Sequence, residues 1–153
     1  MADTKPFETS ESDQVHVRTV VATNPNTPEP VLKKLAQDDS AVIRRHVALN
    51  PRSTVEILQL LAKDADADVR LAVAENPNSP ADLLIELSKD EDDDVKLGVA
   101  ENPNMPEAIL LELSQSDNPF IKDRAMKTMG QLPADVQERL KKEIAQPQDR
   151  LPH

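Results

Sequence analysis

The sequence contains no cysteine, no tryptophan and no tyrosine, and only two glycines. Without cysteine the chain forms no disulfide, holds no thiolate zinc site or iron–sulfur cluster, and uses no cysteine nucleophile. The two glycines, Gly98 and Gly130, are too few for a glycine-rich phosphate-binding loop. Two phenylalanines are the only aromatic residues, so the core must consist of Val, Leu, Ile and Ala. Such a core suits short helices that pack at close range.

Positive charge and long apolar runs are also scarce. The net charge of −10 argues against nucleic acid as the main ligand and against anionic membrane surfaces. No apolar run approaches the ~18–20 residues of a transmembrane helix, and the polar, acidic N-terminus is unlike a signal peptide. The sequence therefore predicts one cytoplasmic domain that binds neither nucleic acid nor membrane.

An Asn-Pro dipeptide recurs along the chain with a constant step of 26 residues. A fixed period of this length is typical of a solenoid built from stacked repeats. Four units align without gaps, and a fifth has lost the Asn-Pro and keeps its phase only with one extra residue near Gly130. The units are residues 17–42, 43–68, 69–94, 95–120 and 121–146. We predict a disordered arm over 1–14, a repeat solenoid over 15–146 and a frayed tail over 147–153.

The sequence pattern of each unit predicts two short helices. The first helix has a good N-cap residue at one repeat position and must end at the Asn that precedes proline. These caps are Ser40, Asp66, Asp92 and Asn118, and in the first unit the helical pattern begins near Val15. For the second helix we predict N-caps at Thr27, Ser53, Ser79 and Met105, with capping boxes from Ser53 to Glu56 and from Ser79 to Asp82. The charged second helix of the fifth unit is typical of a terminal cap.

The combined motif resembles the leucine-rich repeat variant (LRV) family, bacterial repeat proteins similar in style to HEAT and armadillo arrays. The residues that carry the resemblance are Val69-Arg70, Asn76-Pro77, Pro80 and the Leu-Leu-x-x-Leu helix from Leu83. The resemblance implies an all-α, right-handed α-solenoid of about five two-helix repeats, in which the second segment is short and 3₁₀ or helical. The family repeat is typically shorter than this one, so the second segment here could be longer and HEAT-like. One family type carries an iron–sulfur cluster on N-terminal cysteines, which this chain lacks.

Three sets of repeated residues look chemical and have structural explanations. A basic residue per unit forms a ladder that pairs with the Asp residues between units or, alternatively, binds an acidic partner: Arg18, Arg44, Arg70, Lys96 and Lys122. Asn24, Asn50, Asn76 and Asn102 predict a ladder of amides that bind turn backbone. The acidic runs from Asp64 and from Asp90 have calcium-loop spacing but lack its glycine, so we interpret them as helix caps.

The remaining candidates vary from repeat to repeat. The three histidines lack metal-ligand spacing, and no catalytic arrangement stands out, so we predict no enzyme, no cofactor and no metal. Because structural positions repeat, functional ones are expected among those that differ. The candidate partner-binding residues form one apolar strip rimmed by carboxylates on the first helices, or another on the second helices. They are Leu71, Glu75, Leu97 and Glu101, and Leu60, Ile85, Glu86, Leu111 and Glu112.

These patterns predict a non-catalytic scaffold or adaptor that binds a protein partner on one face of the solenoid. The alternative is a self-associating structural protein, an end-to-end homodimer, because apolar surface remains at the first unit. A regulatory or lyase-type subunit is a more distant possibility.

Overall fold

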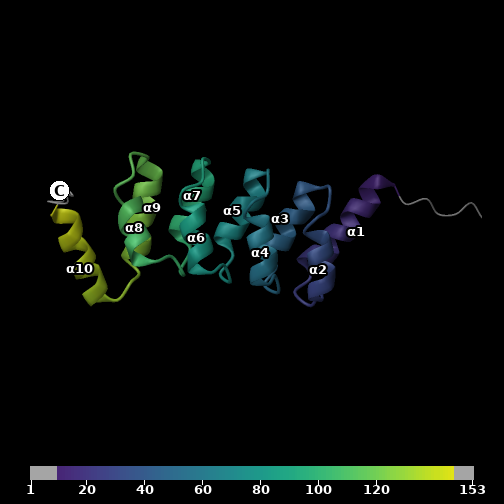
Figure 1. Ribbon diagram of the computed structural model, residues 1–153, viewed down its shortest axis with the longest axis horizontal. Coiled ribbons are helices and arrows are strands. Elements are labelled where there is room, and N and C mark those ends of the chain that lie inside the picture. The colour runs from purple at the N-terminus through teal and green to yellow at the C-terminus, as the bar shows by residue number, and fades with distance from the viewer. Residues whose placement is uncertain (1–9, 147–153) are drawn as a thin grey trace, which may run out of the picture.

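The computed structural model describes residues 10–146, which fold into ten α-helices without a strand (Figure 1). The first helices of the units carry odd numbers and the second helices carry even numbers. The helices are α1 (Glu11–Thr23), α2 (Glu29–Leu35), α3 (Ala41–Leu49), α4 (Val55–Leu61), α5 (Ala67–Glu75), α6 (Ala81–Leu87), α7 (Asp93–Glu101), α8 (Glu107–Leu113), α9 (Pro119–Met129) and α10 (Ala134–Ala145). The predicted all-α solenoid of two-helix repeats is confirmed.

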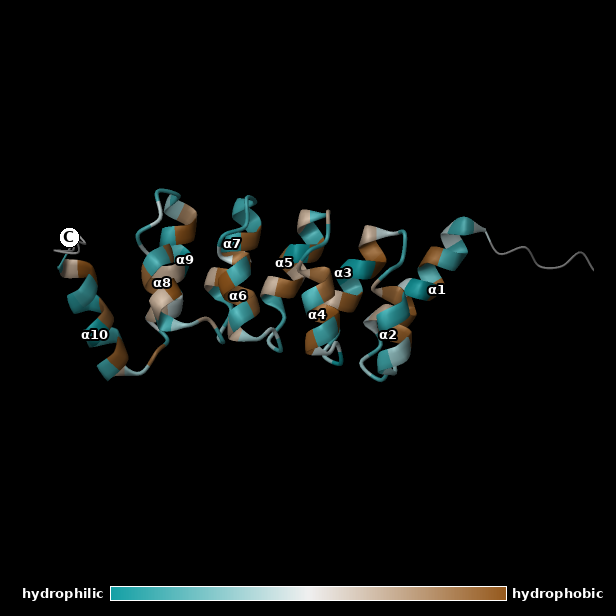
Figure 2. Cartoon of the chain, viewed as in Figure 1, coloured by the Kyte–Doolittle hydropathy of each residue, from teal (hydrophilic) through white to brown (hydrophobic). Residues whose placement is uncertain are grey.

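The helices form two rows along one elongated array (Figure 1). Each odd-numbered helix packs directly against the next odd-numbered helix, from α1 through α9. The even-numbered helices form the second row, and α2, α4 and α6 each pack against the odd-numbered helices on either side of them in the chain. A seven-residue helix is marginal in isolation, so each of these helices depends on the stack for its stability. Figure 2 shows the alternating apolar and polar surfaces that this packing requires.

The first helix of the three middle units, α3, α5 and α7, begins and ends where the sequence predicts. Its N-cap is Ser40, Asp66, Asp92 or Asn118 in α3, α5, α7 and α9. The side chains of the last three accept hydrogen bonds from backbone N–H groups of the first turn, which would otherwise lack a partner. In α1, α3, α5 and α7 the helix ends at the Asn that precedes proline.

The predicted N-caps of the second helices are wrong by one residue. The N-caps of α2, α4, α6 and α8 are Pro28, Thr54, Pro80 and Pro106. The preceding hydroxyl groups point back into the core instead, and Ser79 Oγ donates to Val73 O at 2.5 Å. Ser53 and Thr27 bind the equivalent carbonyls of Val47 and Val21, so the two predicted capping boxes are absent from the structure. The second segment is an α-helix in every unit, which decides between the 3₁₀ and helical alternatives that the resemblance left open.

The structure also differs from the sequence-based predictions at the two ends of the array. Helix α1 begins at Glu11 rather than near Val15, because Ser10 and Asp13 form a capping box. Residues 1–9 of the predicted arm and residues 147–153, the predicted tail, lie outside the described residues. Helix α9 extends to Met129, and α10 begins one residue later than the repeat requires, which confirms the extra residue near Gly130.

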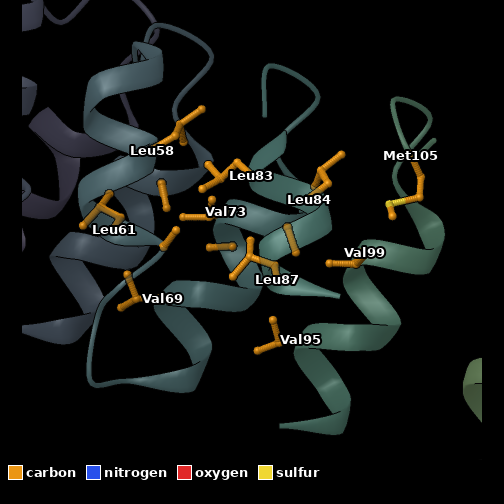
Figure 3. Packing of buried hydrophobic residues seen from close by; sticks show 14 of the residues in the cluster. Leu58, Leu61, Val69, Val73, Leu83, Leu84, Leu87, Val95, Val99 and Met105 are labelled. Atoms are coloured by element: carbon orange, nitrogen blue, oxygen red, sulfur yellow. The ribbon is translucent and has the colours of Figure 1, made fainter. Parts of the chain in front are cut away.

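The core is one continuous column of aliphatic side chains between the two rows. Figure 3 shows how Val69, Val73, Val95 and Val99 of two odd-numbered helices meet leucines from α4 and α6. The repeated alanines Ala22, Ala48, Ala74 and Ala100 are fully buried, because neighbouring odd-numbered helices approach closely there. The core is therefore a product of stacking, and no unit could bury its apolar side chains alone.

Candidate interaction surface

A ladder of buried asparagines fixes each repeat to the one before it. Asn76 Nδ2 donates to Ala48 O at 2.6 Å and to Asn50 O at 3.4 Å, and Asn76 Oδ1 accepts from Asn78 N at 2.8 Å. Asn50 and Asn102 make the same set of bonds one unit earlier and one unit later. The predicted amide ladder is confirmed, and its residues serve the fold.

The ladder extends into the fifth unit through a residue that the sequence reading missed. Thr128 stands 26 residues after Asn102, and its hydroxyl donates to Ala100 O at 2.6 Å. Asn24, at the other end, is exposed because no described repeat precedes it. Counting the repeat phase across the lost Asn-Pro would have identified Thr128, since a hydroxyl replaces the amide as donor.

The basic ladder is structural where it consists of arginine. Arg70 Nε and Nη2 bind the two carboxylate oxygens of Asp90 at 2.8 and 3.0 Å, and Nη1 donates to Asp64 O at 2.9 Å. Arg44 binds Asp64 in the same bidentate manner, and Arg18 Nε lies 3.1 Å from Asp38 Oδ2. Arg44 and Arg70 thus each tie one inter-repeat loop to the next, with bidentate hydrogen bonds between charged partners.

The Arg44–Asp64 and Arg70–Asp90 pairs shift the pKa values of both partners. The hydrogen bond from Arg70 lowers the pKa of Asp90, and the bond to Asp90 raises the pKa of Arg70. For Asp64, burial acts to raise the pKa, but hydrogen bonds from Arg44 and the Asp66 N–H outweigh it and the pKa is lowered. The carboxylates of Asp64 and Asp90 are therefore ionised, and each is bound by an arginine.

The arginine ladder stops at the fourth unit. Ser116 occupies the position at which the pattern would place an Asp for Lys96, and Lys96 Nζ instead lies 2.6 Å from Asp93 Oδ1 on its own helix. Lys122, the fifth member, is exposed on α9. The predicted pairing with inter-repeat Asp residues holds for the three arginines and fails for Lys96, since Ser116 replaces the carboxylate at the corresponding position.

The acidic runs that have calcium-loop spacing act as caps and ladder partners. Asp64 Oδ1 accepts from Asp66 N at 3.0 Å, and Asp66 Oδ1 accepts from Asp68 N at 2.9 Å. The run from Asp90 repeats this arrangement. Among residues 10–146 no group of three or more His, Cys, Asp or Glu side chains is placed to hold a metal ion.

The candidate residues of the first helices are largely engaged within the stack. Leu71 is half-buried and lies so close to Gly98 of the next repeat that a Cβ there would stand 2.6 Å from Leu71 Cδ1. Leu97 is half-buried against the core, and Glu101 forms an ion pair with Arg124. Glu75 is exposed on α5. Neighbouring repeats therefore cover most of this strip.

The candidate residues of the second helices are more accessible and lie on a different row. Leu60 of α4 is 48% exposed, Glu86 of α6 and Glu112 of α8 are exposed, and Ile85 and Leu111 are half-buried. A groove of about 380 Å³ separates α4 from α6 and is lined by Gln59, Lys63, Asp82, Leu83 and Glu86. The nine candidates thus divide between two rows, and the even-numbered row is the better candidate surface.

The structure adds exposed apolar residues that the sequence reading did not single out. Val55, at the start of α4, is also exposed. On the odd-numbered row Val42 and Phe120 are exposed at corresponding positions of α3 and α9. Both lie near the N-terminal end of their helices, where the repeat pattern places Asp in the other units, and that departure was the available signal.

Comparison with protein families supports the resemblance deduced from the repeat motif. The family model described as leucine rich repeat variant matches residues 15–40 and 67–92. The two segments begin 52 residues apart, which is two repeat periods, so they cover equivalent parts of the repeat. No curated protein and no solved structure matches the chain significantly. None of the helices in residues 10–146 is long and apolar enough to cross a membrane.

Proposed function

We propose that this leucine rich repeat variant protein is a non-catalytic adaptor that binds a segment of another protein along its even-numbered helices. The proposal rests on the contrast between positions that keep the same residue type in every unit and positions that vary among the units. Residues that repeat are committed to the ladders and the core, whereas exposed positions of the second helices vary along the array, as in Lys34, Leu60 and Glu86. A scaffold with a variable surface is the arrangement that solenoids use for recognition.

The charge along the even-numbered row supports a directional partner. Lys33 and Lys34 of α2 are exposed at one end, and Glu86 and Glu112 of α6 and α8 are exposed toward the other end. Between them α4 presents the apolar Leu60. An apolar centre flanked by charged rims is typical of a protein-binding surface.

The chemistry of the partner follows from this gradient. The segment would place an apolar side chain on α4, basic side chains opposite α6 and α8, and acidic ones opposite α2. Opposite charges at the two ends would fix its direction and speed its association. We further propose a cytoplasmic setting without enzymatic activity, which the lack of cysteine and the net charge of −10 support.

Affinity capture from the native cell with quantitative mass spectrometry tests the proposal. The bait variant Leu60→Asp places a charge in the apolar centre, and Glu86→Lys inverts the adjoining rim. Both residues are exposed, so neither change should alter the melting temperature by more than a few degrees. We expect both variants to lose the proteins that the wild-type chain captures.

The matched control is Val42→Asp, which introduces the same charge at an exposed valine of the odd-numbered row. Capture should persist in this variant. If Leu60→Asp and Glu86→Lys retained every partner while Val42→Asp lost them, the odd-numbered row would be the binding surface and our assignment would be wrong.

A further inference from the structure

The first repeat exposes apolar side chains at positions that are buried or half-buried in later repeats. Val17 is 59% exposed, whereas its equivalents Ile43, Val69, Val95 and Ile121 are 0–1% exposed. Val31 is 39% exposed, and its equivalents Ile57 and Leu83 are 2 and 3% exposed. Val20 is 53% exposed, where α5 has the fully buried Ala72. We name Val17, Val20 and Val31 the N-terminal face.

In the interior units the preceding repeat covers the corresponding positions. Gly98, the equivalent of Val20, lies against Leu71 and Ala74 of α5, one unit earlier. Leu83, the equivalent of Val31, lines the groove that α4 borders from the preceding unit. The exposure of the N-terminal face is therefore a property of position in the stack: among residues 10–146 nothing precedes α1 and α2.

The opposite end of the array does not offer a matching surface. The α9 residues that would face a following repeat are Asp123, Met126 and Lys127, and Asp123 pairs with Lys127 at 3.0 Å. In the interior units the position of Met126 is a buried alanine, which permits close approach of the next helix. Helix α10 closes the even-numbered row and buries Leu140. A head-to-tail contact between copies would thus set charges and a large side chain against the valines.

The N-terminal face is instead complementary to itself. Asp13 lies in the first turn of α1 and Lys34 in the last turn of α2, and both are exposed. The two helices run antiparallel, so these opposite charges lie toward the same end of the helix pair (Figure 1). Two shallow hollows, of about 340 and 540 Å³, flank Arg18 and are lined by Asp13 and Lys34 respectively.

We propose that the N-terminal face is the interface of a two-fold symmetric dimer with a second copy of this chain. With the symmetry axis parallel to the helices, α1 of one copy packs on α2 of the other. Val17 and Val20 then meet Val31 of the second copy, and Asp13 meets Lys34 of the second copy. Such an isologous contact uses the same patch twice and closes at two copies, whereas a head-to-tail contact would propagate.

Sedimentation velocity of the purified full-length protein, over about 1 µM to 1 mM, tests the dimer. We expect a dimer whose dissociation constant rises at least ten-fold in Val17→Asp, because each copy would bury an unpaired charge. Val42→Asp, an equally exposed valine outside the face, should leave the constant unchanged. Because the assay uses the chain alone, its outcome is independent of the adaptor function proposed above.

Two further variants test the geometry. Asp13→Lys should weaken the dimer, and the double variant Asp13→Lys, Lys34→Asp should restore it, while the neighbouring Lys33→Asp has little effect. Because the chain has no native cysteine, a mixture of Val17→Cys and Val31→Cys copies should form a mixed disulfide dimer on oxidation. A protein that stays monomeric at the highest concentration, or a dimer that survives Val17→Asp, would overturn the proposal.

Discussion

The buried asparagine ladder makes a quantitative prediction for Asn76→Asp. The substitution keeps the size and shape of the side chain but replaces the amide donor by a carboxylate. Asn76 donates to the carbonyls of Ala48 and Asn50, and at pH 7 the carboxylate would face the same two oxygens without a proton to share. The bond from Asn78 N to the side-chain oxygen would survive, so the variant isolates the donor function.

The expected cost follows from the bonds lost and the groups left unpaired. Two donated hydrogen bonds contribute about 0.5–1.5 kcal/mol each, and a buried polar group left without its partner costs about 1–3 kcal/mol more. The free energy of unfolding should therefore fall by about 2–6 kcal/mol, from a total of about 5–15 kcal/mol for an ordinary domain. For a chain of this length that corresponds to a melting temperature lower by roughly 4–24 °C.

Asn24→Asp is the matched control, because Asn24 holds the same repeat position at the exposed end of the ladder. Its side-chain oxygen accepts from Asn26 N at 2.9 Å, a bond that an aspartate keeps. Urea unfolding followed by circular dichroism should give a change below about 0.5 kcal/mol for this surface substitution.

The pH dependence provides a second measurement on Asn76→Asp. Burial opposite two carbonyl oxygens raises the pKa of the new carboxyl group, and its protonated form can again donate one hydrogen bond. The stability deficit relative to the wild type should therefore shrink as the pH falls from 7 toward about 4. Equal losses for Asn76→Asp and Asn24→Asp, or a deficit that does not change with pH, would refute the ladder as a source of stability.

Three further predictions concern single contacts. The hydrogen bond from Arg70 lowers the pKa of Asp90. The stabilisation by this pair is therefore present above about pH 4 and is lost as the pH falls through the lowered pKa. Asp90→Asn should reduce the free energy of unfolding in urea by about 1–3 kcal/mol at pH 7 and by much less at pH 2. Ser79→Asp should destabilise more than Ser79→Ala, because Asp is an equally good N-cap but cannot donate to the Val73 carbonyl; thermal unfolding that ranks the two variants in the reverse order would restore the capping interpretation. Gly98→Val should cost more than about 2 kcal/mol in denaturant titration by overpacking, and Leu71→Ala in the same chain should recover part of that loss, because a Cβ at position 98 meets Leu71 Cδ1.

Local sequence rules account for most of the architecture. The 26-residue period requires a stack of equivalent units, and the Asn before each proline ends a helix because the α region is sterically disfavoured there. The acceptor side chains at Asp66, Asp92 and Asn118 fix helix starts for an equally local reason. These effects act over a few residues, so they were predictable without any tertiary structure.

Only the tertiary structure decided how a given polar side chain is used. Ser79 has the sequence context of an N-cap, but its hydroxyl is buried by the stack and donates to the carbonyl of Val73, which also accepts from Asn76 N. Lys96 stands in the basic ladder, but its partner changes because Ser116 replaces the Asp of the loop that follows its helix pair. Such outcomes depend on which groups a neighbouring repeat brings within hydrogen-bonding distance.

Tertiary packing also decided which of the varying residues are exposed. The sequence by itself determined which positions differ among the units, and so named Leu71 and Leu60 with equal weight. Packing against the following repeat half-buries Leu71 over Gly98, whereas Leu60 stays exposed on α4. Val17 stands at a repeat position that is buried in the later units, but it is exposed because no described helix precedes α1. Period and helix boundaries are properties of the chain, but exposure is a property of what lies beside each residue in the stack.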